Sequence, residues 1–104
     1  MRKQKKQKEQ ELSEYIGAVT SRYVVRRGEF RKALAEWFEI KCTCCGSEEK
    51  VVVDHVVPIS RWGINHVANM QFLCWSCNRH KSSQTTDYRD SLTVRLMRWV
   101  YFQV

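Results

Sequence analysis

Two pairs of cysteines constrain the fold of this 104-residue chain more than any other feature. Cys42 and Cys45 form one C-x-x-C pair, Cys74 and Cys77 form another, and 28 residues lie between the pairs. Two residues between the thiols let a tight turn aim both sulfurs at one ion, and four thiolates complete the tetrahedral shell of Zn²⁺. A closed shell of this kind is typical of a structural site. We therefore predict one structural zinc and expect any chemistry to lie elsewhere.

The fifth cysteine, Cys44, is not needed for that shell. Only the Cys42 and Cys45 pair gives a two-residue gap followed by Gly46, so we interpret Cys44 as a spare, partly exposed thiol. Ordinary buried cysteines or a redox pair are the alternatives to zinc, and two matched C-x-x-C pairs favour the metal.

The sequence has no pattern of export or of membrane insertion. Residues 1–10 (MRKQKKQKEQ) hold five Lys or Arg and no apolar run, unlike a secretory signal. No stretch approaches the roughly 20 apolar residues that span a bilayer. We therefore expect a cytoplasmic protein without a membrane partner, in which cysteines bind metal rather than form disulfides.

Apolar periodicity predicts helices towards both ends of the chain and two short strands between the cysteine pairs. The expected elements are a helix over residues 9–25; a helix with an apolar stripe of Phe30, Leu34, Trp37 and Phe38; a strand over residues 50–57 that Pro58 ends; a strand over residues 70–73; a helix opened by residues 74–77 that runs through Lys81; and a helix that starts at Asp87 or Asp90 and buries Leu92, Leu96 and Trp99.

The net charge of +7 is unevenly distributed along the chain. Residues 1–32 contain ten Lys or Arg against four Glu, residues 33–86 contain five of each sign, and residues 87–104 add one positive charge. A basic arm on a neutral centre suggests a polyanionic partner, with nucleic acid first. A solvated leader that only aids solubility is the alternative.

The segment around the cysteine pairs carries polar residues suited to phosphodiester hydrolysis. Asp54 and His55 adjoin in VVVDHVVPIS, Asn69 lies in ANMQFLC, and Asn78 and Lys81 lie in CNRHK. Together with the four cysteines, these stretches resemble the HNH endonucleases over residues 40–82.

That resemblance implies a small α+β fold, with a zinc-stapled ββα-metal core (the HNH or His-Me finger type) flanked by N- and C-terminal helices. It also implies three parts within one structural domain. These are a basic arm with helices over residues 1–39, the nuclease core over residues 40–82, and a C-terminal helix that packs on the core over residues 83–104.

The resemblance further implies roles for four side chains. His55 would be the general base, Asp54 and Asn78 would hold one catalytic divalent cation, Mg²⁺ or Mn²⁺, and Asn69 would brace the loop after His55. A neutral imidazole is a natural base near pH 7, and carboxylate and amide oxygens suit hard cations. Many family members have His in place of Asn78, a ligand that suits transition metals better.

Asp54 and His55 are neighbours in a predicted strand, so their side chains should point to opposite faces. One site that uses both needs a bend or a strand end there, and Pro58 is consistent with an end near His55. In isolation, an Asp-His pair is often a cap or a satisfied buried pair, and Asn69 is often a turn residue.

Neighbouring residues are assigned by helical period and by charge. His80 lies nearly opposite Asn78 on a helix, so we expect it on the DNA-facing or solvent surface rather than at the cation. We expect His66 in an exposed polar loop, and Trp62 and Trp75 in packing roles. The candidate DNA-binding residues, for which solvated surface charge is the alternative, are Lys81, Arg79, Arg61, Arg26 and Arg27.

We hypothesise a metal-dependent DNA endonuclease that cleaves phosphodiester bonds, of double-stranded DNA, by a one-metal mechanism. The alternatives are a non-catalytic zinc module that binds DNA or RNA, and a zinc domain that binds protein. By analogy alone, the expected setting is a phage or mobile element, with the chain acting by itself or within a larger assembly.

Overall fold

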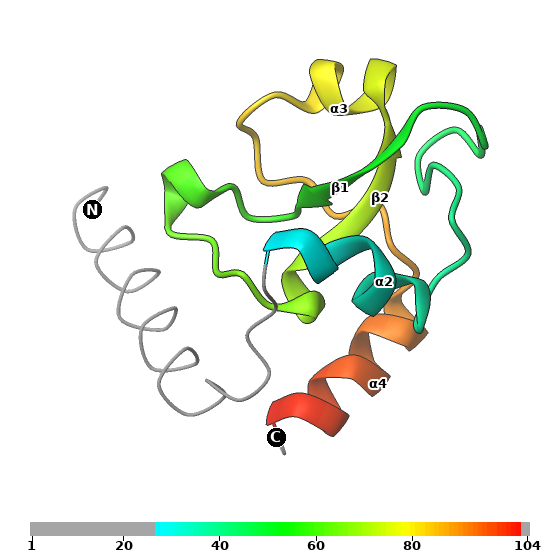
Figure 1. Ribbon diagram of the computed structural model, residues 1–104. Helices are drawn as coiled ribbons and strands as arrows, with labels where there is room; N and C mark the ends of the chain where they lie inside the picture. The colour runs from blue at the N-terminus through cyan, green and yellow to red at the C-terminus, as the bar shows by residue number, and fades with distance from the viewer. Residues whose placement is uncertain (1–26, 103–104) are drawn as a thin grey trace.

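An antiparallel pair of strands, β1 (Val51–His55) and β2 (Met70–Cys74), forms the centre of the computed structural model, which describes residues 27–102. Val51 pairs with Cys74 at one end of the sheet, and His55 pairs with Met70 at the other. α3 (Trp75–Lys81) follows β2 without an intervening loop (Figure 1). The ββα order expected from the sequence is therefore confirmed, and the fold is small α+β.

The strands are short because polar and turn residues bound them on both sides. β1 contains three consecutive valines and ends three residues before Pro58, as predicted. The connection from β1 to β2 contains two 3-10 turns, η3 (Ile59–Arg61) and η4 (Val67–Asn69).

The described chain begins with a 3-10 turn, η2 (Arg27–Glu29), and then α2 (Phe30–Ala35). The helix expected over residues 9–25 lies outside the described residues, as does the DNA contact expected of Arg26. The four apolar residues predicted to form a stripe do face the core: Leu34 is buried, and Phe30, Trp37 and Phe38 pack against the same cluster. The helix is shorter than expected, because α2 ends at Ala35 and leaves Trp37 and Phe38 in the segment after it.

α2 and α4 (Ser91–Phe102) lie on one side of the strand pair and enclose the main core (Figure 1). α3 contacts both strands from the other face, where its Lys81 reaches Asp54. Alternate strand residues point to this core, as the two-residue period of a strand requires. Its buried members are Leu34, Val51, Val67, Met70, Phe72 and Met97. A second, smaller cluster of Cys42, Leu73 and Cys74 lies around the cysteines.

α4 begins as predicted but buries a different face. The Asp90 side chain accepts a hydrogen bond from the Thr93 backbone N–H at 2.8 Å and so caps the helix. The expectation that Leu92, Leu96 and Trp99 are buried is wrong, since all three are exposed and Met97 is the buried residue. Eight of the twelve residues of α4 are apolar, so the sequence pattern alone does not fix which face meets the core.

The loop before α4 is held against the sheet by Arg89. Its guanidinium forms two bonds with the Asp87 carboxylate, at 2.9 and 3.0 Å, and also donates to the carbonyl of Met70 at 3.3 Å. Burial alone would raise the pKa of Asp87, but the bonds from Arg89 hold it below its ordinary value. Among the described helices, none combines the length and apolarity that crossing a membrane requires.

Candidate active site

The four cysteines predicted to bind zinc do converge. The sulfurs of Cys42, Cys45, Cys74 and Cys77 all lie within 4.8 Å of one another. Each C-x-x-C turn is built in the same way, because the backbone N–H of its second cysteine donates to the sulfur of its first at 3.4 Å in both turns. The exposed Cys44 is outside this cluster, as expected from the spacing.

The electrostatics of this cluster fit a bound cation. Burial would raise the pKa of Cys42, but hydrogen bonds from backbone N–H groups, first that of Cys45, lower it to about 6. The adjacent Cys74 sulfur and burial raise the pKa of Cys77. Four thiolates this close repel one another unless a divalent cation neutralises them, and a tetrahedral set of thiolates suits Zn²⁺. The cluster thus supports one structural zinc.

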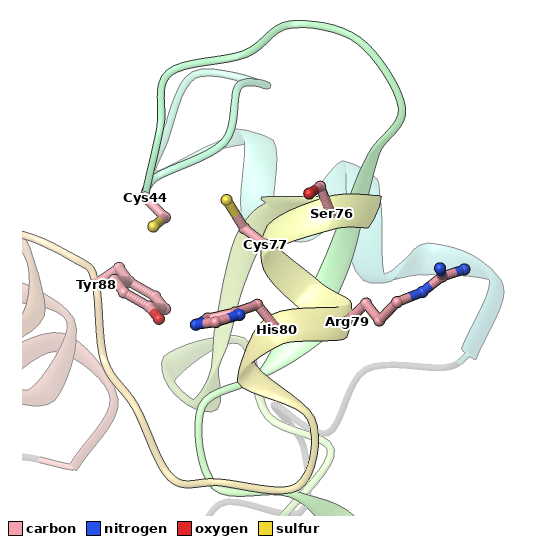
Figure 2. A pocket seen from close by; sticks show the side chains of 6 residues that line it. All are labelled: Cys44, Ser76, Cys77, Arg79, His80 and Tyr88. Atoms are coloured by element: carbon pink, nitrogen blue, oxygen red, sulfur yellow. The ribbon is translucent and has the colours of Figure 1, made fainter.

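A hollow of about 580 Å³ opens beside the cluster, on one flank of α3. Figure 2 shows the Cys77 and His80 side chains pointing to the same side of the helix as Cys44 and Tyr88, whereas Arg79 points away from them. The lining residues are Cys44, Ser76, Cys77, Arg79, His80 and Tyr88. Asn78 does not line the hollow, which agrees with the expected separation of Asn78 from the exposed His80.

Asp54 lies on the face of β1 that α3 covers. Its carboxylate, one-tenth exposed, receives the ammonium of Lys81 at 3.2 Å and the side-chain N–H of Gln71 at 3.0 Å. Both nearer contacts involve Oδ2, whereas Oδ1 meets only Lys81 Nζ at 3.4 Å. Oδ1 therefore keeps most of its capacity to accept a further ligand.

Lys81 has a different role from the one expected of it. Its side chain is fully buried, and Nζ donates to the backbone carbonyl of His55 at 3.0 Å as well as contacting Asp54. The prediction that Lys81 contacts DNA phosphates is therefore wrong, because a buried ammonium that is already paired cannot reach the surface without breaking these bonds. Lys81 instead ties α3 to the end of β1.

Asn78 precedes Lys81 by one helical turn and therefore shares the flank of α3 that faces β1. It is half-buried, and its side-chain amide forms no hydrogen bond with any of the described residues. Its oxygen is thus available as a ligand on the flank of α3 that also carries Lys81. The positive charge of Lys81 would weaken the binding of a cation there.

His55 is the last residue of β1 and faces the opposite side, towards α2. Its Nε2 lies 2.9 Å from the side-chain oxygen of Asn65, and its ring packs edge-on against Phe30 with the centroids 5.7 Å apart. No hydrogen bond among the described residues joins it to Asp54. As predicted, the two side chains leave opposite faces at a strand end, and they share only the backbone that Lys81 holds.

Asn69 cross-links the loop that follows His55. Its side-chain oxygen accepts from the Val57 backbone N–H at 3.0 Å, and its amide nitrogen donates to the carbonyls of Val57 at 3.0 Å and Ile64 at 3.1 Å. All of these side-chain hydrogen bonds therefore go to residues 57–64, which form the loop that Asn69 was expected to brace.

Comparison with known protein families identifies a relative of this ββα unit. Residues 42–84 match the family model of the HNH endonucleases. The chain contains an HNH domain. The match includes both cysteine pairs and the segment from β1 to α3, close to the range of residues 40–82 expected from the motifs. No curated protein and no solved structure gives a significant match to the chain.

The structure corrects three further expectations around the HNH domain. His66 is fully buried rather than exposed: its Nδ1 accepts from the Ala68 backbone N–H at 3.0 Å, and its ring packs edge-on against Tyr101. Burial lowers its pKa to about 4. Trp62 and Trp75, expected to pack, are both exposed. The sequence correctly placed His55 at a strand end, whereas the burial of His66 was not apparent from the composition of its loop.

Two residues that the sequence did not single out complete the HNH domain site. Gln71 is fully buried, and besides its bond to Asp54 it donates to the carbonyl of Thr86 at 2.8 Å and accepts from the Tyr88 backbone N–H at 2.9 Å. A polar residue in the apolar strand MQFLC was the available signal for Gln71. Asn65, the partner of His55, had no such signal.

Among the residues proposed to contact DNA, Arg61 and Arg79 are exposed. Arg61 is in η3, within the connection that Asn69 braces, and Arg79 is on α3. Arg27 lies in η2, where the described chain begins.

Proposed function

We propose that the HNH domain hydrolyses phosphodiester bonds of double-stranded DNA, with His55 as general base and Asp54 and Asn78 as ligands of one divalent cation. The observation that carries the proposal is the local arrangement at the end of β1. There Asp54 contacts Lys81 of α3, which lies one helical turn after Asn78, while the adjacent His55 contacts Asn65 of the following loop. Family membership supports endonuclease chemistry, and the arrangement supports this division of roles.

The surroundings of His55 support its use as a base. An amide oxygen only accepts hydrogen bonds, so the 2.9 Å contact with Asn65 requires the proton on Nε2. The lone pair is then on Nδ1, which is the atom that would take a proton from the attacking water. Half-burial and the Phe30 contact restrict the ring, and the Lys81 bond to the His55 carbonyl restricts its backbone.

The oxygen donors of Asp54 and Asn78 suit Mg²⁺ or Mn²⁺, which commonly take one or two protein oxygens and fill the remaining positions with water and phosphate. A cation bound there would supply charge neutralisation at the scissile phosphate and the leaving oxygen. Lys81 orients the Asp54 carboxylate through the 3.2 Å ion pair, but its positive charge also weakens the attraction of the carboxylate for a second cation. We therefore expect weak cation binding without DNA and stronger binding once a phosphate contributes ligands.

DNA is held, on this proposal, by exposed arginines and by the basic arm. Arg61 and Arg79 are the described candidates, and Arg26 and Arg27 join them at the junction with the arm. These groups would neutralise backbone phosphates without reading sequence, since phosphate contacts position a protein on the duplex but carry no sequence information directly.

The rival function is a zinc-dependent module that binds nucleic acid without cleaving it. The cysteine cluster fits both functions equally, and the hold of Lys81 on Asp54 favours the rival, because it fills part of the ligand capacity that a cation would need. Two features favour catalysis: the Asn78 amide has no hydrogen-bond partner among the described residues, and the His55 ring is oriented by Asn65. A protein that only binds nucleic acid requires neither feature.

Incubation of supercoiled plasmid with the zinc-loaded protein separates these functions. Catalysis predicts nicked or linear product with Mg²⁺ or Mn²⁺ and none with EDTA at a concentration that leaves zinc bound. Retarded plasmid that stays supercoiled in every metal would support the binding module instead.

A further inference from the structure

Two large apolar side chains project into solvent from the connection that follows His55. Ile59 is 55% exposed and Trp62 is 45% exposed, and the intervening residues Ser60 and Arg61 are exposed as well. Isolated exposed apolar residues are common on proteins, but here Ile59 begins the 3-10 turn η3 and Trp62 caps it, with Arg61 between them.

This turn is rigidly built. The carbonyl of Pro58 accepts from the backbone N–H groups of both Arg61, at 2.8 Å, and Gly63, at 2.9 Å, and Trp62 N–H donates to Ile59 at 3.1 Å. The Asn69 side chain closes the base of the loop by its bonds to Val57 and Ile64. Ile59 and Trp62 are therefore held by a fixed scaffold rather than by a flexible tip.

The backbone at the tip is also specialised. Trp62 has φ of +71°, the left-handed region that bulky residues rarely adopt. Gly63 has no room for a side chain, because a Cβ there would lie 1.7 Å from the carbonyl oxygen of Val57. Trp62 packs in neither of the two buried clusters and is 45% exposed, so its strained conformation favours a role in binding.

The turn is close to the proposed base. His55 contacts Asn65, which is three residues after Trp62, so the Cα atoms of Asn65 and Trp62 are at most about 11 Å apart, since consecutive Cα atoms are 3.8 Å apart. Bases along one strand of DNA are spaced by roughly 3.4 Å. The Asn65 side chain and its 2.9 Å contact with His55 extend this bound to about 18 Å, so a strand with its phosphate at His55 would pass Trp62 within roughly five nucleotides.

We propose that Ile59 and Trp62 form an apolar wedge that inserts into the minor groove of duplex DNA and unstacks a base step beside the scissile phosphate. Arg61, between them, would contact a flanking phosphate. The inference deepens the proposed function, because it assigns the surface that positions DNA on His55. Apolar wedges next to basic side chains are a known means of bending DNA from the minor groove, and indoles stack on any base.

Duplex DNA is a better occupant of this wedge than a second copy of the chain. In a two-fold dimer formed through this turn, Arg61 of one copy would face Arg61 of the other, and like charges repel. The same arginine attracts a DNA phosphate. A wedge also explains why the turn is rigid, since unstacking requires a side chain that does not yield.

The test measures DNA binding in a His55→Ala background, in which the DNA stays intact. A fluorescently labelled mixed-sequence duplex is titrated with protein over a range of salt concentrations. Trp62→Asn removes the indole and keeps a residue that tolerates left-handed backbone. Trp75→Ala is the matched control, because Trp75 is equally large and 59% exposed but begins α3, outside the turn. Arg61→Gln reports on charge.

The wedge predicts that Trp62→Asn raises Kd by about 5- to 150-fold, the usual loss of a stacking residue. The log–log salt slope should not change, because an indole displaces no counterions. Arg61→Gln should instead reduce the slope by about 0.9, and Trp75→Ala should change neither quantity. Unchanged Kd for Trp62→Asn, or an equal loss for Trp75→Ala, would overturn the proposal, as would a loss that coincides with altered self-association in sedimentation.

Zinc content and circular dichroism establish that each variant is folded. Should Trp62→Asn fail this check, Trp62→Phe in the same background replaces it: saturating DNA must quench indole fluorescence of the parent, and the Phe variant must lose that quenching. Persistent quenching would overturn the wedge. Failure of the proposed function is separate, since a protein that never cuts plasmid can still depend on Trp62 for binding.

Discussion

Lys81 and Asp54 form a buried ion pair that joins the last helix of the HNH domain to the strand that carries His55. The ammonium contacts both carboxylate oxygens and the His55 carbonyl, and Gln71 satisfies a further lone pair of Asp54. Such a pair is costly to desolvate, but removing one partner is more costly because the other charge stays buried and uncompensated. The pair therefore fixes the position of the end of α3 relative to the end of β1.

Lys81→Met tests this structural assignment. We expect the free energy of unfolding to fall by about 3–5 kcal/mol, the usual cost of breaking a buried pair. Denaturant titration of the zinc-loaded protein measures it. The double variant Lys81→Met/Asp54→Asn should recover part of the loss, because it removes the orphaned charge. If Lys81→Met instead leaves stability intact and weakens DNA binding, Lys81 is a surface contact after all.

His66 makes stability depend on pH. Burial lowers its pKa from 6.5 to about 4, so between these values the unfolded chain takes up a proton that the native state excludes. The free energy of unfolding should therefore fall as the pH falls from 6.5 towards 4, by at most about 3 kcal/mol. His66→Asn keeps an acceptor for the Ala68 N–H but does not titrate. Because acid release of zinc affects both proteins, equal pH dependence in the two would contradict this role.

The C-x-x-C turns and α3 were the elements that sequence spacing predicted best. Their geometry is local: two residues between thiols, a glycine at φ +81° after the first turn, and a helix that begins directly after Cys74. The strands were equally predictable from the sequence, because three consecutive valines and a following proline mark β1. Local patterns of this kind determine local structure, whatever the rest of the chain does.

Four of the five cysteines should be essential for folding, because they are the four expected to bind zinc. Structural zinc contributes about 10–16 kcal/mol of apparent binding energy, as much as or more than the stability of a small domain. We expect Cys42→Ser or Cys77→Ser to unfold the domain and Cys44→Ser to leave it folded. Circular dichroism and metal analysis, with one zinc per native chain, measure this. Native dichroism in protein freed of zinc would contradict the structural role.

Contacts between elements that are distant in sequence were not predictable from the sequence. Lys81 looked like a surface cation because its partner, Asp54, is 27 residues away. The buried face of α4 depends on how the helix meets η4, and His66 is buried by Tyr101, 35 residues further on. The residue types of the site and their order could be predicted from the sequence. The contacts that orient His55 through Asn65 and Asp54 through Gln71 could not, because they join residues 10 and 17 positions apart.

The uneven charge of the whole molecule should govern affinity rather than chemistry. Residues 1–10 contain five Lys or Arg and one Glu. Their deletion should weaken DNA binding and flatten the log–log salt dependence, by about 0.9 for each phosphate that the shortened protein no longer neutralises. Turnover at saturating DNA should change little. An unaltered salt slope would mean that this segment only aids solubility.

The division of roles between two histidines of the same domain is the most direct test of the account. His55 ends β1 with its ring oriented by Asn65, and His80 lies exposed on the flank of α3 that faces the hollow beside the cysteine cluster. We expect His55→Ala to keep zinc, fold and DNA affinity but to slow plasmid cleavage by about 10²- to 10⁴-fold, the worth of a positioned base. His80→Ala should retain most activity. An inactive His80→Ala beside an active His55→Ala, both folded and zinc-loaded, would contradict the assignment.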